Sequence, residues 1–493
     1  MKSRRVPLLT PIDRRSFLRA AGVAGAGLLL PSSWLFGCGS DGGGRTREQA
    51  VPYSVDPNVS WWLQNNFDPV FDEIHVADLE VRGKIPPELS GVYVRNGSNP
   101  QSGETVHWFL GDGMLHGIRL EGGAASWYRN RYVRTVLYEQ GIGYEDGVIP
   151  TGGNNQSNVS PVYHAGRLLT SGEVGAPYQI DPSDLSTVGV YTFDGHLNTS
   201  FTAHSKIDPA TGYLHFFGYW IGPPFLTYHV ADETGRVIHS EEIPVGRSTM
   251  IHSFAITDRD AIFWELPVVF DIQGVITREW PFHWEESYGA RIGVLPLGGP
   301  ASEIRWIEID PCYVFHELNA WRDGEQIVLD VCRYPYMMDG ERFGDIDLKL
   351  HRWTIGTGGE DLTFSDQILE DSRLEFPHHD RRFTGRPNRY GWFVEARNPP
   401  DTIDQGGIFH IDHRTGELRH WDPGPNDHCG EPFFVPGDSG EGEGWILSLV
   451  YDHAENSSRL AILDALNVER GPVAEIMLPR RVPYGFHGVW VPD

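Results

Sequence analysis

The chain has 493 residues, 40% of them hydrophobic and 12% aromatic, which is enough to bury a large core in one large or two medium domains. The formal net charge of −27 argues against nucleic acids and anionic membranes as electrostatic partners. The four cysteines (Cys38, Cys312, Cys332 and Cys429) show no C-x-x-C spacing, so buried free thiols are expected, with a Cys312–Cys332 bridge as the alternative.

Residues 1–37 are predicted to form a signal peptide. Several arginines precede an apolar run at residues 20–30, which is too short to cross a bilayer as a helix. Within the basic part, Arg14-Arg15-Ser16-Phe17-Leu18 resembles the bacterial twin-arginine export signal. That route carries proteins already folded, which suits a chain that loads a metal in the cytoplasm. We therefore expect a periplasmic or membrane-anchored bacterial protein.

Residues 38–51 are predicted to be a flexible linker because of their glycine-rich start. The sequence Leu35-Phe36-Gly37-Cys38 resembles a lipoprotein cleavage box with Cys38 as the lipidated residue, although Phe36 replaces the small residue usual there. A lipid on Cys38 would attach the protein to a membrane. The alternative is an ordinary disordered tail, in which the twin arginine and the apolar run are coincidences.

Residues 52–493 are predicted to form a single β-propeller domain. From about residue 80 onward, short β-branched and aromatic runs alternate with turn sequences, and helical periodicity is scarce. Such runs occur at residues 91–95, 261–265, 326–331, 407–411 and 444–451, and similar turns recur at 208–212, 232–235 and 412–416. Many short strands without helical crossovers predict an all-β fold, with seven blades of about 50 to 60 residues. A β-helix would need a shorter and more regular period.

Two long segments, residues 268–288 and 334–347, fit neither a strand nor a tight turn. Loops of this length usually carry function. Both are rich in aromatic residues, so we expect them to line an apolar substrate tunnel, with a small core beneath long loops as the alternative. The candidate tunnel residues are Phe270, Trp280, Trp284 and Tyr336, together with Phe282, Met337 and Met338.

Four histidines stand in separate β-like segments: His204, His252, His316 and His487. His204 precedes a predicted hairpin whose turn is Asp208-Pro209-Ala210-Thr211-Gly212. No single helix could bring these four together, whereas the inner strands of a propeller all face one axis. Four neutral imidazoles suit iron, copper or zinc.

Carboxylates are expected around such a centre, because four neutral ligands leave the charge of the ion unbalanced. Glu173, Glu375 and Glu431 stand in segments with few other charges and are candidates to hold the ring N–H groups, although ordinary salt bridges are the alternative for each.

Competing motifs are weak. His316-Glu317 lacks the second histidine of H-E-x-x-H, and no G-x-S-x-G or dinucleotide fingerprint occurs. The pairs His378-x-Asp380 and His410-x-Asp412 could begin a site of two histidines and one carboxylate, but 21 histidines make such pairs common by chance.

An ordered series of motifs from about residue 79 to the C-terminus resembles the carotenoid cleavage oxygenases, the family that includes the retinal pigment epithelium isomerase and the lignostilbene dioxygenases. These motifs are GVYVRNGSNP (91–100), HWFLGDGMLHGIRL (107–120), YRNRYVRT (128–135), FTAHSKIDPATGYLHFFGY (201–219), MIHSFAI (250–256), VFHELNA (314–320), LDVCRYP (329–335), LEFPHHDRRFTGR (374–386), GEPFFVP (430–436) and RVPYGFHGVWV (481–491).

The resemblance implies a seven-bladed propeller with a dome of loops and short helices over the metal site. It implies Fe²⁺ on His204, His252, His316 and His487, with Glu173, Glu375 and Glu431 behind them. It further implies that O₂ cleaves a C=C bond of a conjugated apolar substrate into two carbonyl products, with no side chain acting as acid or base. Two positions depart from the family pattern: Ser253 replaces a common Asp, and Val159 stands where many relatives have Thr.

The leading hypothesis is therefore an exported, iron-dependent dioxygenase that cleaves a carotenoid or apocarotenoid. A phenolic stilbene is the alternative substrate, but the lysine expected near residues 128–135 for binding the phenol is replaced by Val136-Leu137. A propeller lipoprotein that binds ligands without catalysis is the alternative of another class. Membrane association is expected through the lipid anchor and the apolar tunnel mouth.

Overall fold

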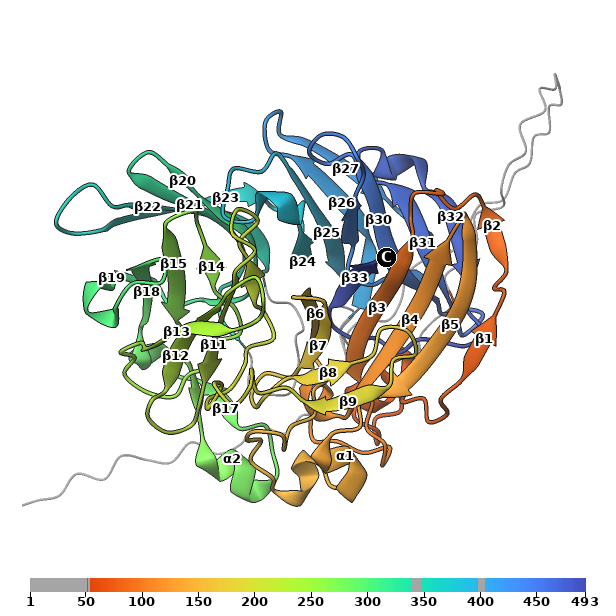
Figure 1. Cartoon of the computed structure of the whole chain (residues 1–493), viewed down its shortest axis with the longest axis horizontal. Coiled ribbons are helices and arrows are strands. Elements are labelled where there is room, and N and C mark those ends of the chain that lie inside the picture. Colours follow the sequence, from red (N-terminus) through yellow and green to blue (C-terminus); the bar gives the residue numbers. More distant parts are fainter. Residues whose placement is uncertain (1–50, 52–53, 338–346, 398–403) are drawn as a thin grey trace, which may run out of the picture. The chain divides into compact units, whose positions relative to one another are not determined.

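Seven antiparallel sheets are arranged as blades around a central axis in the computed structural model (Figure 1). The structure describes residues 51, 54–337, 347–397 and 404–493. The prediction of an all-β, seven-bladed propeller is confirmed. The predicted boundaries at residues 37 and 51 lie at or beyond the edge of the described residues and stay predictions.

Four of the blades are simple four-stranded meanders that run outward from the axis. Their strands are β6 (Ser160–His164), β7 (Arg167–Ser171), β8 (Tyr178–Ile180) and β9 (Thr187–Val190); β10 (Lys206–Ile207), β11 (Leu214–Tyr219), β12 (Leu226–Ala231) and β13 (Val237–Glu242); β20 (Tyr313–Asp323), β21 (Gln326–Tyr334), β22 (Lys349–Gly356) and β23 (Thr363–Glu370); and β24 (Leu374–His378), β25 (Tyr390–Arg397), β26 (Asp404–Asp412) and β27 (Glu417–Trp421).

The fifth blade carries an insertion between its second and third strands. It consists of β14 (Ala255–Ile256), β15 (Asp260–Glu265), β18 (Ala290–Pro296) and β19 (Arg305–Ile309). The insertion holds the two-stranded sheet of β16 (Val268–Phe270) and β17 (Phe282–Trp284), with helix α2 (Ile272–Thr277) between them. The first predicted tunnel segment is this insertion.

The two remaining blades combine both ends of the described chain, which closes the ring. β33 (Gly488–Pro492) pairs with β3 (Gly91–Ser98), and β2 (Val81–Gly83) pairs with β32 (Pro472–Met477). The other strands of these blades are β1 (His75–Ala77), β4 (Gly113–Glu121), β5 (Ala124–Tyr132), β28 (Asp427–Cys429), β29 (Phe433–Pro436), β30 (Gly444–Asp452) and β31 (Ser457–Asp464). These pairings place N-terminal and C-terminal strands in the same blades and so hold the ring closed.

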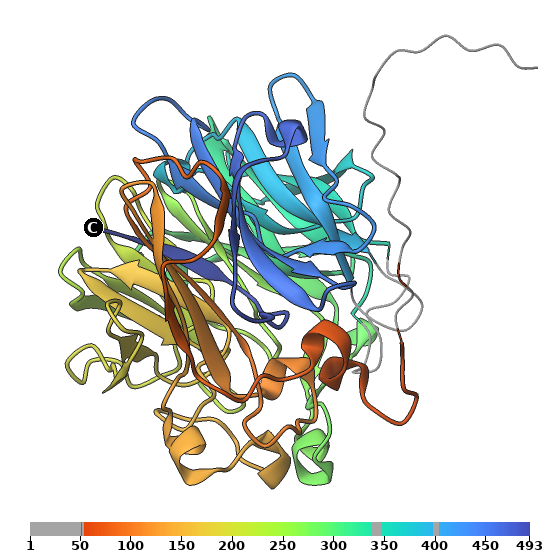
Figure 2. The same ribbon diagram turned by 90° about the vertical axis from the view of Figure 1, so that its right-hand side faces the viewer.

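Short helices gather on one side of the blades, together with the loops that form the dome. Figure 2 shows α1 (Val136–Gln140) and α2 at the lower edge, with the segment of η1 (Trp61–Leu63) and η2 (Asn65–Phe67) on the same side. The other short helices are η3 (Trp108–Leu110), η4 (Tyr144–Asp146), η5 (Glu286–Tyr288), η6 (Ala301–Glu303), η7 (Arg381–Phe383) and η8 (Val468–Arg470).

Local turn chemistry sets the hairpins. Between β10 and β11, Asp208 accepts hydrogen bonds from the Ala210 amide and the Thr211 hydroxyl, and Gly212 adopts a φ of 74° that favours glycine. The hairpin predicted after His204 is therefore confirmed. Side chains buried between blades fix the packing; for example, Trp392 of β25 stacks on Phe434 of β29 with ring centroids 4.6 Å apart.

The three cysteines in the described part of the chain, Cys312, Cys332 and Cys429, are free and buried.

Candidate metal centre

Four imidazoles converge where the inner strands of four blades begin. His204 lies just before β10, His252 just before β14, His316 within β20 and His487 just before β33. One ring nitrogen from each lies within 4.8 Å of the other three. The Nε2 atom of His252 is 2.9 Å from that of His204 and 3.3 Å from that of His316. Adjacent nitrogens bound at about 2.1 Å to one ion are roughly 3 Å apart, so the spacing fits a shared metal.

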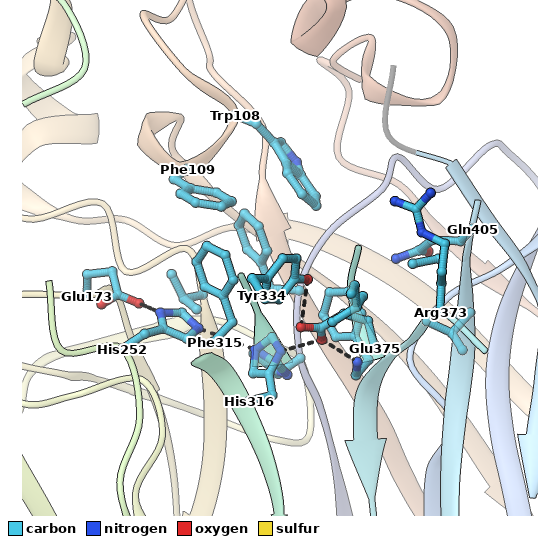
Figure 3. A pocket seen from close by; sticks show the side chains of 17 residues that line it. Trp108, Phe109, Glu173, His252, Phe315, His316, Tyr334, Arg373, Glu375 and Gln405 are labelled. Atoms are coloured by element: carbon cyan, nitrogen blue, oxygen red, sulfur yellow. Dashed lines mark hydrogen bonds and ion pairs between the residues drawn. The ribbon is translucent and has the colours of Figure 1, made fainter. Parts of the chain in front are cut away.

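Three glutamates hold the outward-facing nitrogens of three of these histidines. Nδ1 of His316 donates to Glu375 at 2.6 Å, and Nδ1 of His487 donates to Glu431 at 2.9 Å. Glu173 contacts Nδ1 of His252 (Figure 3). A proton held on Nδ1 leaves the lone pair of Nε2 directed at the common centre, which is the tautomer a metal requires.

The glutamates are in turn fixed by donors that the sequence did not suggest. The Tyr219 hydroxyl of β11 donates to Glu173 at 3.0 Å, and the Tyr334 hydroxyl of β21 donates to Glu375 at 2.9 Å. The Gly488 amide donates to Glu431 at 2.6 Å. Each tyrosine lies in a regular strand, and nothing in the local sequence distinguishes it from a core residue.

Electrostatics keep the centre ready for a cation. Burial, followed by the neighbouring His252, lowers the pKa of His204 well below its ordinary value, and burial also lowers the pKa of His487. At His316 burial acts in the same direction, but the charge and hydrogen bond of Glu375 outweigh it and raise the pKa. Burial would raise the pKa of Glu375, yet His316 holds it below the usual range. The carboxylate that favours a positive charge on His316 would equally favour a divalent first-row metal bound to that ring in place of a proton.

An apolar cavity lies against this centre. His252, His316 and His487 form one part of its lining, and six aromatic residues are the largest group among the others. Figure 3 shows Trp108 and Phe109 above the histidines, with Phe315 between them. The lining residues are Trp108, Phe109, Val159, Glu173, His252, Phe315, His316, Tyr334, Leu348, Arg373, Glu375, Phe376, Val394, Ala396, Gln405, Phe486 and His487. An apolar ligand here would lie directly beside the four nitrogens.

Comparisons with known proteins identify the family. A family model described as retinal pigment epithelial membrane protein matches residues 67–492. The chain belongs to the carotenoid cleavage oxygenases. It is 34% identical to the carotenoid cleavage oxygenase of Mycobacterium tuberculosis, over 87% of this chain and 97% of the relative. It is 33% identical to the carotenoid 9,10(9',10')-cleavage dioxygenase 1 of Arabidopsis thaliana, over 88% of this chain and 90% of the relative.

A solved structure is similar over the same region. The lignostilbene dioxygenase of Pseudomonas brassicacearum superposes with a TM-score of 0.82 at 27% identity, covering 89% of this chain and all of that one. A twin-arginine translocation signal matches residues 11–31 and supports twin-arginine export. Cys38 lies outside the described residues. Among the residues that the structure does describe, no helix combines the length and apolar character needed to cross a membrane.

The predicted tunnel residues separate into two groups in this oxygenase. Phe270, Trp280 and Phe282 line a second apolar cavity, which shares Phe109 and Glu173 with the first. The prediction for Trp284 and Tyr336 needs correction, because neither lines these cavities.

Trp284 and Tyr336 lie outside the two cavities, each in a different environment. Trp284 packs from β17 against the core between blades, and Tyr336 is 41% exposed. Met337 is buried in the same core, and Met338 lies outside the described residues. Aromatic content alone did not indicate which side chains of the long segments point inward.

The two departures from the family pattern both lie near the centre. Val159 lines the first cavity, and its carbonyl accepts a hydrogen bond from the His487 amide. Ser253 accepts a hydrogen bond from Lys206 at 3.5 Å, and Lys206 pairs with Glu317. An acidic residue at position 253 would therefore lie within reach of Lys206.

The alternative site of two histidines and one carboxylate receives no support. Within the described ranges, the four histidines are the single group of metal-binding side chains found close together. Asp380 binds Arg382, and Asp412 binds Arg389.

We expect the stability of the protein to fall as the pH drops below about 6.5, in part because of His107. Burial lowers the pKa of His107 to about 3, and its Nδ1 accepts a hydrogen bond from the Phe109 amide that caps η3. The unfolded chain takes up this proton near pH 6.5, so the stabilising contribution is complete above that pH and is lost toward pH 3.

Urea unfolding between about pH 7 and about pH 4.5 measures this loss. The variant His107→Gln can still accept the Phe109 hydrogen bond but does not titrate, so its unfolding free energy should depend less on pH. An equal pH dependence in both proteins would contradict the assignment.

Proposed function

We propose that the protein is an iron-dependent dioxygenase that cleaves a C=C bond of a carotenoid or apocarotenoid with O₂ to give two carbonyl products. The observation that carries the proposal is the convergence of four imidazoles, backed by three glutamates, at the wall of an apolar cavity. Fe²⁺ would be held by His204, His252, His316 and His487. When bound, it would activate O₂ for addition to the adjacent double bond.

The protein itself would position the substrate and exclude water from the reaction site. The rings of Trp108, Phe109 and Phe315 offer flat apolar walls to an extended polyene, and burial in such walls is favourable without any specific polar contact. The same walls exclude water from the reacting carbons. Both atoms of O₂ enter the products, so the reaction needs no reductant and no side chain that transfers a proton.

A phenolic stilbene is the second candidate substrate, favoured by the similarity to the lignostilbene dioxygenase structure. Against it, no lysine lines either of the two apolar cavities formed by described residues, so the lysine expected to bind the phenol is missing there. Position 136, where the sequence lacks that lysine, begins helix α1. The polyene therefore remains the better fit.

For localisation, we propose that the exported protein is held at a membrane by a lipid on Cys38, with a mouth of the apolar cavity facing the source of the substrate. The cleavage-box sequence supports this proposal, and mass spectrometry of the mature N-terminus tests it. An unmodified N-terminus would refute the anchor without affecting the proposed activity.

Product analysis tests the activity. Anaerobically purified, Fe²⁺-loaded enzyme is given a panel of carotenoids, apocarotenoids and stilbenes under isotopically labelled O₂. We expect polyene consumption, O₂ uptake and one labelled oxygen atom in each carbonyl product. Faster cleavage of stilbenes would favour the second substrate class. Bound iron without O₂ uptake across the panel would favour a ligand-binding protein without catalysis.

A further inference from the structure

Arg373 gives one end of the first cavity a positive charge. The residue directly precedes β24, and Glu375 lies two positions later in that strand. Side chains two positions apart point to the same face of a strand, so Arg373 enters the same cavity as Glu375 at a distance of about 7 Å along the strand. Figure 3 shows Arg373 beside Gln405, on the side of the cavity opposite Glu173 and His252.

The guanidinium of Arg373 has donors without acceptors. Its Nε and Nη2 atoms are buried and form no hydrogen bond. The two carboxylates that line the same cavity are used elsewhere: Glu173 contacts His252, and Glu375 binds His316, Tyr334 and the Phe376 amide. Apart from Gln405, the nearby lining is apolar and includes Leu348, Val394 and Ala396. Leaving charged donors unpaired in such a place is costly.

Two other arginines of this chain show what the guanidinium edge formed by Nε and Nη2 binds. Arg322 uses Nε and Nη2 to hold both oxygens of Asp260, each at 2.6 Å. Arg352 holds Asp330 in the same way at 2.7 and 2.8 Å. In Arg373, which lines the cavity, this edge has no partner. Its geometry matches a planar carboxylate.

We propose that Arg373 binds the terminal carboxylate of a polyene whose reacting double bond lies at the histidine centre. The inference rests on the proposed function and narrows its substrate class to acidic apocarotenoids. Arg373 and the four histidines stand in or next to the end strands of five different blades, namely β24, β10, β14, β20 and β33. Because these strands hold them in place, the carboxylate would also set which double bond reaches the centre. A single pair of products is therefore expected from an acid substrate.

Two matched substrates test whether the positive charge of Arg373 binds a carboxylate. One is an all-trans apocarotenoid that ends in a carboxylate, and the other is the apocarotenoid that ends in a methyl group at the same carbon. Fe²⁺-loaded wild type, Arg373→Met and Arg373→Lys are compared by kcat/KM from O₂ uptake and by Kd from anaerobic tryptophan-fluorescence titration. Arg82→Met, which removes an exposed arginine, is the control variant.

We expect Arg373→Met to lower kcat/KM and affinity for the acid by at least about tenfold, while values for the hydrocarbon and the iron content stay unchanged. Arg373→Lys keeps the positive charge but loses the pair of donors that can bind both carboxylate oxygens. It should therefore retain part of the preference for the acid over the hydrocarbon. The control variant should match wild type.

An equal loss for both substrates, or no loss for the acid, would overturn the role of Arg373. If wild type cleaves the hydrocarbon but shows no preference for the acid, this inference fails and the proposed function stands. If iron-loaded wild type cleaves neither substrate, the proposed function fails, and the two Kd values alone decide whether Arg373 binds a carboxylate.

Discussion

Replacing His316 with alanine should abolish the retention of iron. The substitution removes one of four converging nitrogens, and it leaves Glu375 buried without its imidazole partner. Tyr334 and the Phe376 amide remain bound to this carboxylate, but the loss of its imidazole partner leaves its charge less well compensated and disturbs the centre further. Iron per chain, measured after anaerobic Fe²⁺ loading and gel filtration, should be stoichiometric in wild type and close to zero in His316→Ala.

His379→Ala is the matched control. His379 lines another cavity, which also borders His204, His316 and His487. Its Nε2 bonds the Thr384 hydroxyl at 3.0 Å, and it does not belong to the group of four converging histidines. Its loss should leave iron content unchanged. Circular dichroism and thermal unfolding establish that both variants are folded. Equal iron in the two variants would refute the assignment of His316 as a ligand.

The sequence was most informative where structure is local. The runs at residues 261–265 and 326–331 became β15 and β21, because short apolar runs rich in β-branched and aromatic residues favour a buried strand. The turn from Asp208 to Gly212 formed as expected because its hydrogen bonds and positive φ depend on five consecutive residues.

The centre itself depends on contacts that spacing does not encode. His487 approaches the other histidines because β33 pairs with β3, almost four hundred residues earlier in the chain. Nothing around the histidine predicts that pairing. The separate β-like segments singled out the four histidines and supported a general site for iron, copper or zinc, whereas the choice of iron came from the resemblance to a family.

The tunnel prediction failed in part for a related reason. Trp280 and Trp284 stand in the same aromatic segment, yet only Trp280 lines a cavity, because β17 turns Trp284 into the core. Burial in a core and exposure to an internal cavity select the same residue types. Trp108 and Phe109 were passed over because they lie in a short helix, η3, whose orientation depends on the cap from His107.

Replacing Glu375 with glutamine should weaken iron binding by roughly 10- to 100-fold without abolishing it. The amide oxygen can still accept the hydrogen bond from Nδ1 of His316, so the ring stays oriented. The negative charge that makes the imidazole a stronger donor is lost, and the centre holds a divalent ion less tightly. A competition titration with a ferrous chelator measures the change in Kd.

The variant Glu317→Gln is a control that separates the effect of the hydrogen bond between Glu375 and His316 from the effect of negative charge near His316. Glu317 is buried beside His316, and its charge also raises the pKa of His316, but its side chain pairs with Lys206 instead of an imidazole. If the contact from Glu375 to Nδ1 strengthens the metal bond, Glu317→Gln should weaken iron binding much less than Glu375→Gln. If both variants lose the same affinity, the glutamates act only through their overall charge, and the orientation of the imidazoles must come from the backbone of the inner strands.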